Sequence, residues 1–215
     1  MPAQEKNTSE KYKKVMENSR IEKITERIYR LIVPFEDLYT SVFFIRTKNG
    51  CAVVDCATTN KDVDEYIVPA IRSLGIEKDM QYLILTHDHG DHTGGKERMI
   101  ELFPSLETVN GVRAVALDGI TLCALKGHTF DCIGVFDSES GTLISGDGLQ
   151  GDGIGKYRRS LESEAEYLCT VENLKKDKRV KNLLFSHAYE PWYKDSAIGE
   201  NEVQKCLADC LRGLQ

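Results

Sequence analysis

The stretch Thr-His-Asp-His-Gly-Asp-His-Thr-Gly-Gly, residues 86–95, places three histidines within six positions. His87 and His89 are separated by a single residue, and Asp91 and His92 follow after one glycine. Three imidazoles this close together would repel one another on protonation and would strain the packing of a core. Imidazole and carboxylate groups are, by contrast, ordinary ligands of zinc, iron and manganese. The stretch therefore indicates a loop that chelates metal.

Four more polar residues stand just after short apolar stretches, as the histidine loop itself does after residues 82–85. They are Asp55, His128, Asp147 and His187, which follow residues 51–54, 120–125, 142–144 and 183–185. Such stretches predict strands, and the ends of strands in a packed sheet are rigid positions for chemistry. Alone, His187 would be interpreted as a structural histidine and Asp147 as a turn residue. Together they indicate one metal site that uses all five histidines of the chain.

The number of donors favours two metal ions over one. Five histidines with Asp91 and Asp147 make seven candidate ligands, whereas a catalytic zinc ion commonly takes about three from the protein. Two divalent cations with a bridging hydroxide would keep a residual positive charge that polarises a carbonyl or phosphoryl oxygen, and their bound water would ionise near neutral pH. We therefore expect hydrolysis by a metal-bound hydroxide. Zinc is the expected metal, with iron and manganese as alternatives.

Composition and charge exclude several other classes of protein. The chain has 215 residues, of which 41% are hydrophobic and 29% charged, and a net charge of −6. A nucleic-acid-binding protein would need a basic surface, and neither a signal peptide nor a run of about 18 apolar residues indicates export or a membrane span. Seven cysteines without a C-x-x-C pair suit a reducing compartment. We expect a cytoplasmic protein that acts on a small-molecule substrate, with a homodimer left open.

The pattern along the chain predicts one α/β domain over residues 21–215, preceded by a polar helix or tail over residues 1–20. Strand-like alternation covers residues 21–47, and a turn at residues 48–50 leads into a strand at residues 51–55. Helical patterns are found at residues 59–74, 95–102, 162–175 and 200–214.

Residues 86–95 resemble the H-x-H-x-D-H signature of the metallo-β-lactamase superfamily, and the sequences around His128, Asp147 and His187 match its remaining ligand motifs in order. The resemblance covers residues 21–187. It implies an αββα sandwich of two mixed β-sheets flanked by helices, with the metals at one edge between the sheets. In that family one metal would be bound by His87, His89 and His128, the second by Asp91, His92 and His187, and both by a bridging Asp147.

The resemblance also gives expectations for the residues around the ligands. Asp55 matches a strand end where it would accept a hydrogen bond from a ligand imidazole. The chain departs from the family at Cys56 and Ala57, where Thr-Gly or Cys-Gly is usual, and Cys56 could border the site. Gly94 and Gly95 would let the loop approach the start of the next helix closely.

Within the superfamily, the chain is similar to the zinc-type hydrolases. His89 stands where diiron oxygen reductases usually carry a carboxylate, and the 28 residues after His187 are too few for the C-terminal helical domain of glyoxalase II-like thioesterases. We expect a compact, dinuclear, metal-dependent hydrolase of a lactone, thioester or small phosphoester, in which Asp91 or Asp147 orients the nucleophile. Candidate substrate-binding residues, which could equally be a solvated helix start or a cover for the core, are Lys156, Tyr157, Arg158, Tyr189 and Trp192.

The alternative is a mononuclear iron-dependent oxidoreductase of the same fold, similar to the sulfur dioxygenases of the superfamily. These keep the motif but use only two histidines and one aspartate on a single iron. Metal content per chain would separate the two hypotheses. A third, a non-enzymatic scaffold, is disfavoured by the complete set of donors.

Overall fold

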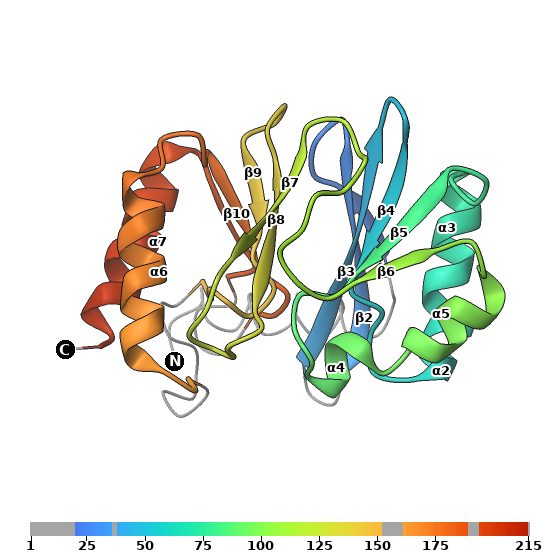
Figure 1. The fold of residues 1–215 in the computed structure, drawn as a ribbon, viewed down its shortest axis with the longest axis horizontal. Helices are drawn as coiled ribbons and strands as arrows, with labels where there is room; N and C mark the ends of the chain where they lie inside the picture. The colour runs from blue at the N-terminus through green and yellow to red at the C-terminus, as the bar shows by residue number, and fades with distance from the viewer. Residues whose placement is uncertain (1–19, 36–37, 152–160, 189–193, 215) are drawn as a thin grey trace, which may run out of the picture.

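Two β-sheets lie face to face at the centre of the structure, and helices cover the outer face of each sheet (Figure 1). The computed structural model describes residues 20–35, 38–151, 161–188 and 194–214. Both sheets mix parallel and antiparallel pairs. The predicted αββα sandwich is therefore confirmed.

The first sheet has six strands in chain order. Its first four strands pair antiparallel, and the last two add in parallel. The strands are β1 (Arg20–Lys23), β2 (Ile28–Phe35), β3 (Leu38–Thr47), β4 (Gly50–Val54), β5 (Met80–Ile84) and β6 (Glu107–Val109).

The second sheet has five strands in the order β11-β10-β9-β8-β7. β9 and β10 pair in parallel, and the other neighbours pair antiparallel. The strands are β7 (Ile120–Ala124), β8 (Ile133–Asp137), β9 (Thr142–Ile144), β10 (Asn182–Leu184) and β11 (Ser196–Ile198).

The helices form the two outer layers (Figure 1). Those beside the first sheet are α2 (Asn60–Asp62), η1 (Val63–Ile67), α3 (Val68–Leu74) and α5 (Lys96–Leu102). A short α4 (Gly90–Thr93) lies in the histidine loop. Those beside the second sheet are α6 (Glu164–Lys176) and α7 (Glu200–Arg212).

Strand β3 shows how the layers are held together. Its buried side chains alternate, since Phe43 and Ile45 enter the layer between the sheets while Val42 and Phe44 pack under the helices. This follows from the two-residue period of a strand. Apolar side chains of the second sheet, such as Ile144, complete the layer between the sheets. A strand buried on both faces cannot slip by one residue without exposing half of these side chains, so the residues at its end are firmly placed.

The helix predicted at residues 59–74 is present, but it contains a π-helical segment that the sequence pattern did not predict. The N–H of Val68 bonds to the C=O of Val63, five residues earlier. Pro69 follows at the start of α3. Because proline has no N–H and its ring excludes the carbonyl four residues back, a wider turn accommodates it.

The pattern also did not predict β6, β8 and β11. Two of these have three residues each, and β8 contains Gly134, which weakens a strand pattern. The predicted polar helix or tail lies outside the described residues except for Arg20, which begins β1. Among the described helices none combines the length and apolar content that a membrane span requires.

Candidate metal centre

All seven predicted donors come together where strands of the two sheets end. They follow β5, β7, β9 and β10, so four strand ends supply them. Their donor atoms form overlapping groups in which all atoms lie within 4.8 Å of one another. The groups are His87-His89-His128, His87-His92-Asp147 and Asp91-His92-His187.

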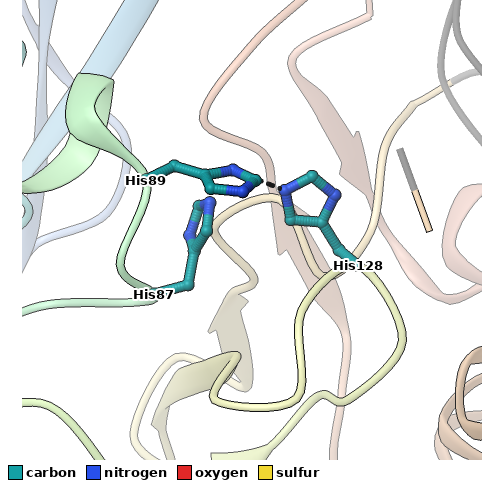
Figure 2. Close-up of side chains that lie close together, drawn as sticks. All are labelled: His87, His89 and His128. Atoms are coloured by element: carbon teal, nitrogen blue, oxygen red, sulfur yellow. Dashed lines mark hydrogen bonds between the residues drawn. The ribbon is translucent and has the colours of Figure 1, made fainter. Parts of the chain in front are cut away.

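The first group consists of His87, His89 and His128, whose rings gather around one point (Figure 2). Nδ1 of His89 lies 3.0 Å from Nε2 of His128. Two ligands of a tetrahedral zinc ion with bonds of about 2.0–2.1 Å stand about 3.3 Å apart, so this spacing is close to what a shared cation requires. His89 is exposed whereas the other two histidines are buried, which opens the group to solvent on one side.

The second group consists of Asp91, His92 and His187. Oδ2 of Asp91 lies 3.0 Å from Nε2 of His187 and 3.6 Å from Nε2 of His92. Both imidazoles are buried, and the carboxylate is partly exposed. This group therefore has one negative ligand that solvent can reach.

Asp147 lies between the two groups. Its Oδ2 is 3.5 Å from Nε2 of His187 and 3.8 Å from Nε2 of His128. Its Oδ1 is 3.7 Å from Nε2 of His92. One buried carboxylate thus faces imidazole nitrogens from both groups, which is a suitable position for a ligand that bridges two cations.

Buried hydrogen bonds behind two of the histidines fix which ring nitrogen faces the site. Oγ1 of Thr86 donates its one proton to Oδ2 of Asp55 at 2.9 Å, so it can only accept from Nδ1 of His87 at 3.2 Å. Asp55 also accepts from Nδ1 of His92 at 2.8 Å and from the N–H of Thr86 at 2.8 Å. In the neutral rings Nδ1 therefore carries the proton, and Nε2 turns a lone pair toward the other donors.

Three donor atoms of the site lack hydrogen-bond partners. Among the described residues, Nε2 of His87, Nε2 of His92 and Oδ1 of Asp147 are buried side-chain atoms without a hydrogen-bond partner. A buried polar atom left unpaired costs about 1–3 kcal/mol. All three atoms belong to the group His87-His92-Asp147. A bound cation would satisfy them together, so the residues fit a metal ion.

Burial and the neighbouring carboxylates set the charges of the metal-free centre. Burial lowers the pKa of His87 to about 2, and the charge on His92 adds to the shift. Burial also acts to lower the pKa of His187, but Asp147 and Asp91 outweigh it and raise that pKa to about 9. Burial acts to raise the pKa of Asp91, yet His187 and His92 lower it to about 2. An incoming cation must therefore displace protons from the carboxylate-paired histidines.

The turn α4, which carries His92, is pressed against the loop after β4. The N–H of Cys56 bonds to the C=O of His92 at 2.8 Å, and the Cys56 thiol lies 3.3 Å from the same oxygen. A Cβ at Gly94 would lie 1.8 Å from the carbonyl oxygen of Thr58, so only glycine allows this approach. Cys56 is buried in the core behind the turn and contacts His92 at its backbone carbonyl.

Two residues of that loop adopt a left-handed backbone. Asp55 has a φ of 62° and Ala57 a φ of 58°. A side chain in this region costs about 1–2 kcal/mol per residue. The first conformation turns the Asp55 carboxylate toward Thr86 and His92, and the second occurs at the position where the family resemblance leads us to expect glycine.

His128 is held by the segment that begins α6. The N–H groups of Glu162 and Ser163 bond to the C=O groups of His128 and Gly127, at 3.1 Å each. The Glu162 carboxylate in turn accepts from the N–H of Phe130 at 2.7 Å. The loop around His128 is therefore anchored on both sides of the imidazole.

The predicted substrate-binding residues lie outside the described part of the chain: Lys156, Tyr157, Arg158, Tyr189 and Trp192. Sequence reasoning missed two residues that orient candidate donors, Thr86 and Tyr39. The carbonyl oxygen of Tyr39 accepts from Nδ1 of His187 at 2.7 Å. Sequence reasoning could have found Thr86 from a weak indication, because a small hydroxyl residue separates the apolar strand from His87. A backbone carbonyl has no signal, because every residue carries one.

The protein is an αββα sandwich with histidine and aspartate donors gathered at its strand ends. Comparisons with known proteins show which family it resembles. A model of the metallo-beta-lactamase superfamily matches residues 36–105. The chain is 25% identical over 188 residues to an atrochrysone carboxyl ACP thioesterase of Pseudocercospora fijiensis. It is 27% identical over 182 residues to the beta-lactamase-like protein 2 homolog of Caenorhabditis elegans. Both alignments cover 72% of this chain, but 56% and 59% of those proteins, so the chain spans little more than half their length.

Solved structures agree on the fold. The FIM-1 metallo-beta-lactamase of Pseudomonas aeruginosa in its mono-zinc form aligns with a TM-score of 0.71 at 14% identity, covering 91% of this chain and 96% of that one. A metallo beta lactamase of Erythrobacter litoralis aligns with a TM-score of 0.67 at 18% identity, covering 90% and 96%. The matched family model and the curated relatives, together with the shared fold, support membership of the metallo-β-lactamase superfamily.

Proposed function

We propose that this protein is a metal-dependent hydrolase that uses two divalent cations, zinc in the first place, to cleave an ester-like bond. The observation that carries the proposal is the position of Asp147. Its carboxylate lies within 3.8 Å of imidazole nitrogens from both donor groups. Two sets of donors that share one buried carboxylate are typical of centres in which paired cations act on the attacking and leaving oxygens.

In this proposal each donor group has its own task. His87, His89 and His128 hold one cation, and Asp91, His92 and His187 hold the other. Cations bound there would supply Lewis acidity, lowering the pKa of water and polarising the bond to be cleaved. Asp147 keeps the two groups at a fixed separation. Asp91 is aligned by His187 and is partly exposed, so it can hydrogen-bond a water molecule that enters the site.

Thioesters are the first substrate class to test. Two relatives at 25% and 26% identity, from Pseudocercospora fijiensis and Claviceps purpurea, are named atrochrysone carboxyl ACP thioesterases. This chain spans 56% of each of them, so the activity of the whole relative supports a proposal only. Lactones and small phosphoesters belong in the same panel, because a polarised carbonyl or phosphoryl oxygen serves all three reactions.

Metal analysis followed by hydrolysis assays tests the proposal. We expect two zinc ions per chain and release of free thiol from an acyl thioester. Asp147→Asn should lower the rate about 100-fold. Asp88→Asn is the matched control, since it changes an exposed aspartate of the same loop that belongs to no donor group, and it should leave the rate nearly unchanged. One iron per chain with oxygen uptake and no hydrolysis would overturn the proposal in favour of the oxidoreductase alternative.

A further inference from the structure

A buried arginine stands behind the second donor group. Arg30 on β2 is only 6% exposed. Its guanidinium lies 2.9 Å from Oδ2 of Asp195 and 2.5 Å from Oε2 of Glu22. A buried charge is tolerated only when it is paired, and removing one partner is strongly destabilising. Burial acts to raise the pKa of Asp195, but the Arg30 charge outweighs it and lowers that pKa, so Asp195 is a fixed anion.

Asp195 contacts the two segments that position His187, at Tyr39 and at Phe185. Its Oδ2 accepts a hydrogen bond from the Tyr39 hydroxyl at 2.9 Å, and the Tyr39 carbonyl accepts from Nδ1 of His187 at 2.7 Å. Its backbone carbonyl accepts from the N–H of Phe185 at 3.0 Å. Tyr39, which holds the imidazole, is therefore tied to the Asp195 carboxylate, and the strand end that carries His187 is tied to the Asp195 backbone carbonyl.

These contacts join the two sheets at the donor edge. Arg30 and Tyr39 lie on β2 and β3 of the first sheet, whereas His187 follows β10 of the second. The N–H of Ser41 bonds to the C=O of Ser186 at 2.8 Å, next to His187. Because the bond to the Tyr39 carbonyl holds the proton on Nδ1, it leaves Nε2 of His187 toward Asp91 and Asp147. A shift of Tyr39 would turn the ring away from them.

We propose that Arg30, Asp195 and Tyr39 are positioning residues for His187, and that they set the affinity of the Asp91-His92-His187 group for its cation. This inference deepens the proposed function and rests on it for the role of the cation. It predicts that the His87-His89-His128 group, which shares none of these contacts among the described residues, keeps its affinity when the positioning residues are changed.

Two variants of the full chain test the inference. Asp195→Asn removes the anion, and Tyr39→Phe removes only the hydroxyl. Zinc titration against a competing chelator should resolve two binding steps in the wild type. We expect one step to weaken about 10-fold to 100-fold in Asp195→Asn, and less in Tyr39→Phe, with the other step unchanged. Two unchanged steps in both variants would overturn the inference, and a wild type that binds no zinc would overturn the proposed function instead.

Asp137→Asn is the matched control. Asp137 is also a buried aspartate paired with an arginine, since its Oδ1 lies 3.2 Å from Nη1 of Arg27. It ends β8 at the far end of the strand from Ile133, whose N–H bonds to Thr86 beside the centre. It should lower the stability of the protein but leave both zinc-binding steps as they are. Equal losses of zinc affinity in Asp137→Asn and Asp195→Asn would reduce Asp195 to a general structural role and overturn the inference.

A readout without metal keeps the test independent of the proposed function. In the metal-free wild type, the His187 Nδ1 proton should exchange slowly with solvent by nitrogen-15 NMR, because it is buried and bonded to the Tyr39 carbonyl. In Asp195→Asn and Tyr39→Phe it should exchange at least about 10-fold faster. Unchanged exchange in both variants would show that Asp195 does not hold the Tyr39 carbonyl in place, whatever metal the protein binds.

Discussion

Asp55 and His92 form a buried pair in which Oδ2 of the carboxylate lies 2.8 Å from Nδ1 of the imidazole and both side chains are 0% exposed. We expect Asp55→Ala to weaken zinc binding about 10-fold to 100-fold, because the ring loses the acceptor that fixes its tautomer. Unfolding in urea should also show a loss of at least about 1–3 kcal/mol, since the buried N–H of Thr86 loses its partner. Zinc affinity equal to that of the wild type would contradict the orienting role of Asp55.

Ala57→Gly should be nearly neutral for stability, within about 1 kcal/mol. Loss of the buried methyl costs about 0.8 kcal/mol and the flexible glycine about 0.5–1 kcal/mol, but release of the left-handed backbone at a φ of 58° returns about 1–2 kcal/mol. Ala52→Gly is the comparison, because Ala52 is equally buried within β4 without a positive φ. It should lose about 1–2 kcal/mol. Equal losses at both positions in urea unfolding would remove the strain argument.

Gly94→Ala should destabilise the protein by at least about 1–3 kcal/mol, the usual cost of overpacking. Its Cβ would lie 1.8 Å from the Thr58 carbonyl oxygen, and the turn that carries His92 would have to move. Gly111→Ala is the control, since a Cβ there meets no atom within 4 Å. Thermal unfolding should show a lower midpoint for the first variant alone. If both variants kept the wild-type unfolding midpoint, the loop after β4 would have moved to make room for the new methyl group at no cost in stability.

The gathering of the candidate donor residues could be predicted because their chemistry is distinctive and the spacing of the first four is local. His87, His89 and His92 lie within six positions, and the isolated donors each follow an apolar stretch that does form a strand. The pattern along the chain predicted one α/β domain, and the αββα sandwich was implied by the resemblance to the metallo-β-lactamase superfamily.

Contacts between distant segments could not be predicted. The Tyr39 carbonyl and Asp195 act on His187 through backbone bonds and a buried ion pair that form only when the two sheets meet. The π-helical segment before Pro69 could not be predicted from the spacing of apolar residues, because that spacing indicates a helix without showing a wider turn. Strand β8 was not predicted because the glycine at its second position weakens the strand pattern. In each case tertiary packing outweighs the local pattern.

The metal-free protein should be most stable near pH 6.5. The folded pKa of His187 is raised to about 9, so the stability that its charged form contributes is complete below the unfolded value of 6.5 and is lost as pH rises through about 9. The folded pKa of His87 is lowered to about 2, so the unfolded chain takes up a proton there as pH falls below 6.5, and stability falls again. Urea unfolding of chelator-treated protein measures both slopes. The pH should run from about 5 to about 9, that is from about 1.5 units below to about 2.5 units above the ordinary histidine pKa.

Zinc should reverse the alkaline slope, because His187 must be neutral to bind it and binding therefore strengthens as protons become scarce. His187→Gln should reduce that slope in the metal-free protein without abolishing it, because Asp55 and Asp147 outweigh burial and also raise the pKa of His92. The variant should keep the loss below pH 6.5 that comes from His87. A slope that is the same in wild type and variant would assign the alkaline effect to another group.

Thr86 should affect both donor groups, which separates it from Asp55 and Asp195. Its one hydroxyl donates to Asp55 and accepts from Nδ1 of His87, so it sets His87 directly and His92 through the carboxylate. Thr86→Val keeps the shape and removes the hydroxyl. We expect both zinc-binding steps to weaken about 10-fold.

Thr86→Ser is the matched control for the hydroxyl, because it keeps the Oγ and loses only a methyl group. It should restore most of the zinc affinity in both steps, with a small loss of stability of about 0.8 kcal/mol from the missing methyl. If Thr86→Val weakened one step alone, the hydroxyl would not be shared between His87 and Asp55. The tautomer of His87 would then have to be set by another group, since the shared hydroxyl is the reason that its Nε2 faces the other donors.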